Sequence, residues 1–220
     1  GNPESSFFIV FDRPGFYEER TGEPFQGDPA KLLLKILNKA GLKYPTDVYL
    51  TYAYKCFCKK DENVEARKES VKVCPSAWLN KEILAHKPKI VVTLGMEATQ
   101  ALLPKSSSIL RMRGAFYDCE IEGHKFSVMP TLSPGFLLQD KNAEKESFVI
   151  ADIKRAFNSV TNGITAWTDE KLKTLNYRTV NTLADFDEMI AEVKERGVFA
   201  IDTETRGKDP YLFNKPDNYF

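Results

Sequence analysis

The first 160 residues alternate short apolar runs with amphipathic segments. Short apolar runs bounded by Gly, Pro or Asp are typical of buried strands, and apolar residues every three or four positions are typical of helices. The predicted strands are Phe7–Phe11, Val48–Tyr54, Lys89–Leu94, Ala115–Ile121 and Lys125–Met129. The predicted helices run from an Asp28 cap to the residue before Gly41, and over Lys59–Val71, Ala77–Ala85, Met96–Leu103 and Phe148–Phe157, with a break at Pro75.

This alternation of strands and helices predicts an α/β fold. Its central sheet is expected to be mainly parallel and to be covered by helices on both faces. In such sheets, binding and catalytic residues collect in the loops beyond the carboxyl ends of the strands. Candidate site residues are therefore expected in the loops after Phe11, Tyr54, Leu94 and Met129.

A second unit is predicted after the polar stretch Asn158–Lys171, where the periodicity lapses. It has a strand at Tyr177–Val180, a helix from Thr182 to Arg196 and a strand at Val198–Asp202. The predicted domain limits are 1–160 for the first domain, 161–175 for a linker and 176–220 for the second unit. These few elements cannot close a core of their own, so we expect the second unit to be part of a longer polypeptide.

Composition and charge narrow the class of protein. The 220 residues are 42% hydrophobic and 28% charged, which is typical of a globular chain. Thirty-one basic residues balance 31 acidic ones, so a nucleic-acid surface would be a local patch, and a histone-like binder is excluded. No apolar run approaches the ~20 residues that cross a bilayer, and Gly1 to Ser6 have neither the basic nor the apolar region expected of a signal peptide. We therefore expect a cytoplasmic protein without a membrane partner, whose four cysteines are reduced.

An ordered set of motifs runs through the first domain. The set is Phe11-Asp12-Arg13-Pro14-Gly15, Gly22-Glu23-Pro24-Phe25-Gln26-Gly27, Lys55-Cys56, Cys74, Leu94-Gly95, Arg113-Gly114 and Pro130-Thr131-Leu132-Ser133-Pro134. In this order the pieces resemble the iron–sulfur (family 4) uracil-DNA glycosylases, over about residues 7 to 157. The resemblance implies a three-layer α/β/α fold with a short, mainly parallel central sheet.

The resemblance also implies a base-binding pocket. Phe25 matches the aromatic residue that stacks on the flipped base, Gly15 belongs to the same base-binding motif, and Asp12 stands where the family has a glutamate that positions water. Two positions depart from the family. Tyr52 replaces an asparagine that reads the uracil edge, and Ser133 replaces a histidine that stabilises charge on the departing base. These departures predict a degenerate pocket that removes uracil very slowly or not at all.

The cysteines match the family only in part. Cys56 and Cys74 fall at the two later ligand positions of its [4Fe–4S] cluster, whereas Cys58 and Cys119 do not fall at ligand positions. Such a cluster normally takes four thiolates. The chain is therefore expected to bind one only with two further cysteines from upstream of Gly1, and the four cysteines are otherwise ordinary thiols.

The second unit carries a different resemblance. The segment Val198-Phe199-Ala200-Ile201-Asp202-Thr203-Glu204-Thr205 is similar to the first exonuclease motif in the proofreading domain of family A DNA polymerases. On a strand, Asp202 and Glu204 would project to one face, as suits carboxylates that hold Mg²⁺ ions for phosphodiester hydrolysis. The resemblance implies the first strands and helix of a ribonuclease H-like exonuclease domain. The remaining carboxylates would lie beyond Phe220, so this piece alone is not expected to cut DNA.

Three functions are consistent with these patterns. The main hypothesis is a non-catalytic domain that binds DNA or replication proteins, at the amino terminus of a phage- or virus-type replication polymerase with a proofreading exonuclease. The alternatives are an active uracil-DNA glycosylase that uses Asp12, and a structural protein-interaction domain. Lys55 and Arg113 are the expected DNA contacts, within a set of basic residues near the predicted site loops: Lys55, Lys59, Lys60, Arg111, Arg113, Lys125 and Lys141.

Overall fold

The computed structural model describes residues 1–58, 64–164, 179–197 and 199, and the chain divides into two units, Gly1–Ala166 and Trp167–Phe220. The first unit contains a five-stranded sheet with the order β2-β1-β3-β5-β4. Its strands are β1 (Phe7–Phe11), β2 (Tyr49–Tyr52), β3 (Ile90–Leu94), β4 (Tyr117–Ile121) and β5 (His124–Thr131). All neighbouring pairs are parallel except β4 and β5, which are antiparallel. The predicted α/β fold with a mostly parallel sheet is therefore confirmed.

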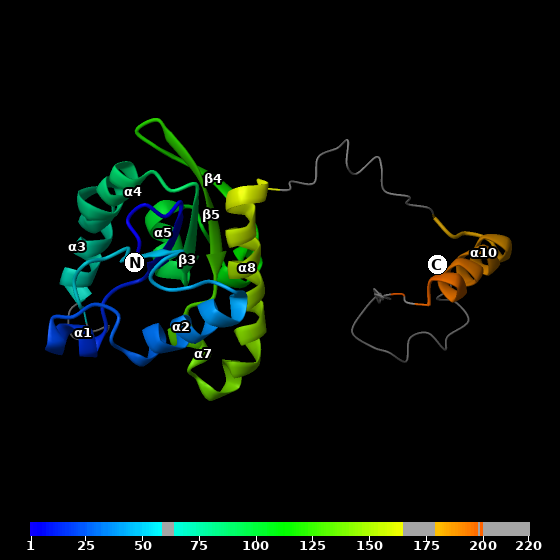
Figure 1. Cartoon of the computed structure of the whole chain (residues 1–220), viewed down its shortest axis with the longest axis horizontal. Helices are drawn as coiled ribbons and strands as arrows, with labels where there is room; N and C mark the ends of the chain where they lie inside the picture. The colour runs from blue at the N-terminus through cyan, green and yellow to red at the C-terminus, as the bar shows by residue number, and fades with distance from the viewer. Residues whose placement is uncertain (59–63, 165–178, 198, 200–220) are drawn as a thin grey trace, which may run out of the picture. The chain divides into compact units, whose positions relative to one another are not determined.

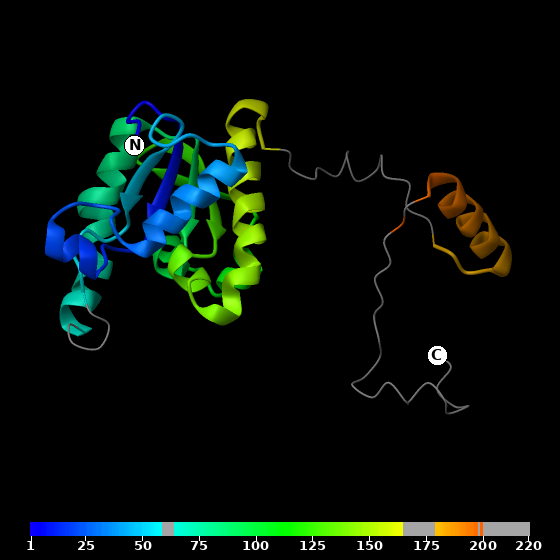
Figure 2. The same cartoon turned by 60° about the horizontal axis from the view of Figure 1, so that its bottom comes forward.

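Helices cover both faces of this sheet (Figure 1). Their bounds are α1 (Phe16–Thr21), α2 (Asp28–Ala40), α3 (Val64–Cys74), η1 (Pro75–Leu79), α4 (Asn80–His86), α5 (Met96–Leu102), α6 (Ile109–Met112), α7 (Pro134–Leu137), η2 (Asp140–Lys145) and α8 (Glu146–Asn162). One face packs on α2 and α8, which lie side by side in Figure 1 and Figure 2, and the other packs on η1, α4 and α5.

The central strand pair is buried on both faces. Alternation along β1 sends Phe7, Ile9 and Phe11 into the core with α2 and α8, and sends Phe8 and Val10 into the core on the opposite face. All five residues of β1 and of β3 are buried. Strands buried on both faces are almost entirely apolar, which is why these two runs can be predicted as strands from the sequence.

The predicted break at Pro75 is wrong. The helices α3 and α4 follow each other without a gap, joined by the π-helical turn η1, in which Asn80 donates its N–H to the Pro75 carbonyl. Proline has no N–H to donate inside a helix, and the widened turn takes up this mismatch without ending the helix. The predicted N-cap of α2 also shifts by one residue, because Gly27 occupies the cap and Asp28 lies in the first turn.

The hairpin between β4 and β5 turns where the sequence predicts it. Glu122 and Gly123 both have positive φ, 47° and 84°, which is the backbone combination of a type I′ turn. This turn and the start of β5 lie at the amino ends of the parallel strands, on the edge opposite Asp12. Lys125, predicted near the site loops, therefore lies at the wrong edge of the sheet.

The second unit contains the helix α10 (Leu183–Arg196), as predicted. Thr182 caps it by accepting the Asp185 N–H, and Gly197 ends it in the left-handed conformation. The strand predicted at Val198–Asp202 lies almost wholly outside the described residues, and Asp202 and Glu204 lie outside them entirely. The domain limits at 160 and 176 stay predictions. Within the described segments, no helix has the length and apolarity to span a membrane.

Candidate active site

Asp12 lies at the carboxyl edge of the sheet, directly after β1. The neighbouring strands β2 and β3 end close by, since Phe11 pairs with Tyr52 and Val10 pairs with Thr93. The parallel strands thus deliver the residues that follow them to one edge, as expected for a doubly covered sheet.

Gly95 brings Asp12 and Ser133 together at this edge. A Cβ built on Gly95 would lie 3.2 Å from Asp12 Oδ2 and 3.1 Å from Ser133 Cβ, and Gly95 has a φ of 93°. A side chain would therefore crowd both neighbours and would strain the backbone. The glycine lets the loops after β1 and β5 approach each other, so Asp12 and Ser133 share one site.

The carboxylate of Asp12 is partly desolvated and held in place. Its Oδ1 accepts a 2.7 Å hydrogen bond from the Ala98 N–H. Burial raises the pKa of Asp12 to about 6, against the opposing effects of that hydrogen bond and of the positive charges of Arg13 and Arg67. A carboxylate with such a pKa is ionised at neutral pH and is a stronger proton acceptor than an exposed one.

Phe25 and Tyr52 form a stacked aromatic pair. Their ring centroids are 4.5 Å apart with an interplanar angle of 14°, and Tyr52 Oη accepts a 3.0 Å hydrogen bond from the Phe25 N–H. Phe11 packs at a tilt against both rings. One face of Phe25, the residue predicted to stack on a base, is therefore covered by Tyr52. Burial raises the pKa of Tyr52 to about 12, so the phenol stays neutral.

Glu18 fastens the loop that carries Phe25. Its Oε2 accepts the Gly15 N–H at 2.9 Å, and its Oε1 accepts the N–H groups of Gln26 at 3.0 Å and Gly27 at 2.9 Å. Partial burial opposes ionisation, but these backbone hydrogen bonds outweigh it and hold the pKa of Glu18 below its usual value. The prediction from sequence missed Glu18, although its three-residue spacing from Gly15 is that of a capping box and could have indicated it.

Replacing Glu18 with alanine is expected to lower the free energy of unfolding by about 1–3 kcal/mol, because three backbone N–H groups lose one acceptor. Amide exchange at Gly15, Gln26 and Gly27 should accelerate with it. Urea unfolding and hydrogen exchange read out the two effects. Glu19→Ala, on the exposed side of the same helix, is the control and should stay within about 0.5 kcal/mol of the parent. Unchanged exchange at all three amides would contradict this role.

Three of the four cysteines lie near one another. Cys56 is exposed, Cys58 and Cys74 are buried, and all are free thiols. Partial burial raises the pKa of Cys56, and the neighbouring Cys74 and Cys58 thiols raise it further. Across the described ranges, no group of three or more His, Cys, Asp or Glu side chains is placed to hold a metal ion. These residues alone therefore do not complete a [4Fe–4S] site.

The two predicted DNA contacts have partners inside the protein. Lys55 Nζ lies 2.7 Å from Glu82 Oε1 and 2.7 Å from Thr51 Oγ1. Arg113 makes a two-pronged ion pair with Asp152, of 2.8 and 3.1 Å, and its guanidinium packs over the Phe148 ring. Both side chains are mostly buried, and their ion pairs within the protein account for their positions without a DNA contact. Lys59 and Lys60 lie outside the described residues.

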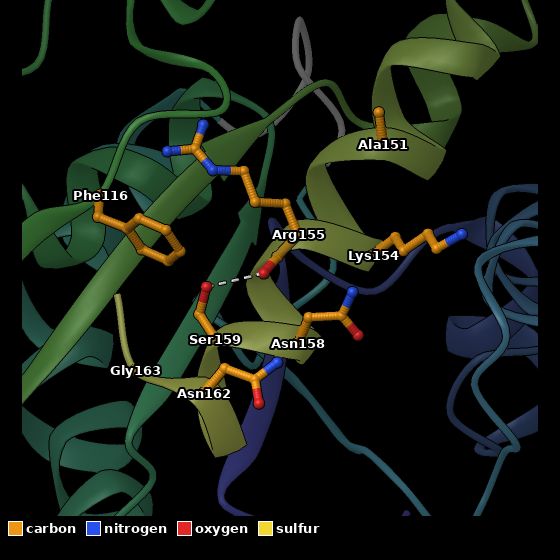
Figure 3. Close-up of a pocket in the computed structure, with 8 residues that line it drawn as sticks. All are labelled: Phe116, Ala151, Lys154, Arg155, Asn158, Ser159, Asn162 and Gly163. Atoms are coloured by element: carbon orange, nitrogen blue, oxygen red, sulfur yellow. Dashed lines mark hydrogen bonds between the residues drawn. The ribbon is translucent and has the colours of Figure 1, made fainter. Parts of the chain in front are cut away.

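Of two surface cavities, one borders the candidate site and the other lies away from it. One of about 530 Å³ lies between the loop after β1 and the segment after β2, and Tyr52, Lys55 and Cys56 are in its lining. Another, of about 430 Å³, lies along the outer side of α8, where Arg155, Ser159 and Asn162 line it beside Phe116 (Figure 3). The second cavity contains none of the residues predicted for the site, so the candidate active site is the edge around Asp12.

Comparisons with known proteins identify the first unit. Residues 1–155 match the family model described as the uracil DNA glycosylase superfamily. The chain is 31% identical over 149 residues to a type-4 uracil-DNA glycosylase of Saccharolobus solfataricus, an alignment that covers 66% of this chain and 68% of that protein. It is also 31% identical over 157 residues to the type-4 enzyme of Thermotoga maritima, covering 71% and 78%.

The family match ends at residue 155 and does not reach Asp202 and Glu204. These comparisons therefore do not support the resemblance of the second unit to a polymerase exonuclease. They do support the resemblance of the first unit to the uracil-DNA glycosylases. The chain belongs to the uracil DNA glycosylase superfamily.

Proposed function

We propose that the first unit is a DNA glycosylase that releases uracil, or a base of similar shape, from DNA. The observation that carries this proposal is the Asp12 carboxylate, which lies partly buried beside Gly95 and Ser133 and is fixed by the Ala98 N–H. The family membership supports the same reaction class. This replaces a non-catalytic domain as the leading hypothesis.

The reaction needs a flipped nucleotide and a water molecule. A base extruded from the duplex would stack on Phe25, while Asp12 would hold a water against C1′ of the sugar. The C1′–N bond breaks with its electron pair going to the base, and the water oxygen forms the new bond to C1′. The Asp12 carboxylate takes the proton that this water loses.

We assign Ser133 the role of donating a hydrogen bond to the departing base. Its Oγ accepts the Phe136 N–H at 3.2 Å, which caps α7 and leaves the hydroxyl proton available for donation. A neutral hydroxyl is a weaker stabiliser of a developing anion than a charged or imidazole donor. We therefore infer slower release than in family members that have the histidine.

Tyr52 is the second residue, after Ser133, that is expected to slow base release. A base can reach the covered face of Phe25 only if the 4.5 Å stack opens and the hydrogen bond between the Phe25 N–H and the phenol breaks. Both contacts stabilise the closed arrangement. The proposal is therefore a working but slow enzyme in which Tyr52 competes with the substrate base.

Replacing Tyr52 with asparagine is expected to raise the rate of uracil release at least about tenfold, because it removes a competing aromatic stack and adds an amide that can pair with the base edge. Release is measured as alkali-labile strand breaks in a uracil-containing oligonucleotide under single-turnover conditions. Tyr52→Phe keeps the stack and should leave the rate low. An asparagine variant that folds, by circular dichroism, and is no faster than the parent would contradict this account.

A non-catalytic DNA- or partner-binding domain of a replication polymerase is the second candidate. The observation that favours it is the same stack, since Tyr52 fills one face of the predicted base platform in the free protein. Fluorescence anisotropy with labelled DNA separates the two candidates. Binding without any base release from the parent or from Tyr52→Asn supports the second candidate, and base release supports the first.

Two further assignments stay proposals. Cys56 and Cys74 would supply two ligands to a [4Fe–4S] cluster, with two more thiolates required. Asp202 and Glu204 would bind Mg²⁺ in a completed 3′ to 5′ exonuclease domain.

A further inference from the structure

Two arginines converge on one glutamate next to Asp12. Arg13 donates to Glu97 Oε2 from Nε at 3.2 Å and from Nη2 at 3.1 Å. Arg67 donates to the other oxygen, Glu97 Oε1. The three residues come from the loop after β1, from α3 and from α5, so their meeting is a product of the fold. We refer to Arg13, Arg67 and Glu97 as the Glu97 cluster.

The Glu97 cluster is largely shielded from solvent. The side chain of Arg13 is 9% exposed, that of Arg67 23% and that of Glu97 33%. Arg13 also stacks over the Tyr54 ring at 4.8 Å, and Arg67 donates to the Cys58 carbonyl. Charges in such a setting are weakly screened, so each one acts strongly on its neighbours.

Glu97 and Ala98 link this cluster to the candidate active site. The Ala98 N–H holds Asp12 Oδ1, and the Glu97 carbonyl accepts the Tyr54 hydroxyl at 3.1 Å. The first turn of α5 therefore makes two contacts at this site. The Ala98 N–H fixes the Asp12 carboxylate, and the Glu97 side chain holds the guanidinium groups of Arg13 and Arg67. The charged or titratable groups that act on Asp12 from the packed elements are Arg13, Arg67 and Tyr54, with Glu97 bound to both arginines.

The charges balance only when Asp12 is ionised. Arg13 and Arg67 contribute two positive charges, and Asp12 and Glu97 contribute two negative ones. Without Glu97, two positive charges would face Asp12 alone. They would hold the carboxylate ionised to lower pH and would make it a weaker proton acceptor.

We propose that Glu97 is a positioning residue that holds Arg13 and Arg67 beside Asp12 and offsets half of their positive charge, so that Asp12 stays basic enough to accept a proton from water. This inference rests on the proposed function only where it assigns Asp12 the role of base. The arrangement of charges stands on the contacts themselves.

The test measures the protonation of Asp12 in the full chain. The ¹³Cγ chemical shift of Asp12, recorded as a function of pH, gives the midpoint of its titration. In Glu97→Gln the amide keeps the size of the side chain but removes the negative charge, and the midpoint should move down by about one pH unit. In Arg67→Gln a positive charge is lost, and the midpoint should move up by a similar amount. Opposite shifts from two variants of one cluster are not expected from loosened packing.

Glu65→Gln is the matched control. Glu65 lies on α3 with Arg67 but pairs with Lys68 in solvent, with 86% of its side chain exposed, so the Asp12 midpoint should not move. An unchanged or raised midpoint in Glu97→Gln would overturn the inference. If Glu97→Gln does not fold, an unchanged or lowered midpoint in Arg67→Gln overturns it equally. The readout needs no catalysis, so absent base release with the expected shifts would count against the proposed function alone.

Discussion

Replacing Asp12 with asparagine should lower the rate of base release by about a thousandfold, since a positioned general base contributes about 10²–10⁴-fold. The asparagine keeps the shape of the residue and can still accept the Ala98 N–H, so the site geometry should persist. The loss therefore reports the missing proton acceptor. Single-turnover release from a uracil-containing oligonucleotide measures it.

The same substitution should stabilise the domain at neutral pH. The pKa of Asp12 is raised by burial from its ordinary value of 3.8 to about 6, so the folded protein binds more protons than the unfolded chain between these values. Stability therefore falls as the pH rises through this window, by at most about 3 kcal/mol. The amide of the Asp12→Asn variant does not ionise, so this variant should unfold at a higher temperature than the parent at pH 8 but not at pH 3. Equal stabilities of parent and variant at pH 8 would contradict the buried, ionised carboxylate.

The largest loss of stability is expected at Asp152, a buried residue of α8 that bonds to Thr131 of β5. Its side chain is 7% exposed, pairs with Arg113 and accepts the Thr131 hydroxyl at 2.6 Å. Asp152→Ala should lower the free energy of unfolding by about 3–5 kcal/mol, because it leaves a largely buried guanidinium without its counter-charge. Urea unfolding measures this loss.

Glu146 provides the control on the same helix. Its ion pair with Lys39 is more exposed, and Glu146→Ala should cost less than about 1 kcal/mol. If the two alanine variants lost similar stability, the buried ion pair between Asp152 and Arg113 would not be the main stabilising contact proposed here. Arg113 would then again be a candidate DNA contact.

The elements of the first unit were predictable because their patterns are local. The apolar run before Asp12 predicts β1, and because β1 is parallel to both neighbours, Asp12 follows it at the carboxyl edge of the sheet. The motif order led to the family that the comparisons support. The error at Pro75 arose because a π-helical turn has no clear mark in a single sequence.

The pairings within the site were not predictable in this way. Arg113 and Asp152 are 39 positions apart, and Arg13 and Glu97 are 84 apart, so no local pattern joins them. Basic residues near site loops suggested DNA contacts, yet Lys55 and Arg113 have carboxylate partners in the folded domain. The stack of Tyr52 on Phe25 depends on a loop conformation with a φ of 60° at Phe25, which the sequence does not indicate.

The most direct test of the proposed function is a paired measurement of free uracil and abasic DNA after incubation of a uracil-containing oligonucleotide with the purified chain. Glycosidic hydrolysis predicts that both products form in equal amounts, slowly for the parent, faster for Tyr52→Asn and about a thousandfold slower than the parent for Asp12→Asn. Absence of both products with the parent and with Tyr52→Asn, or release that Asp12→Asn leaves unchanged, would contradict the assignment of this domain as a glycosylase that uses Asp12.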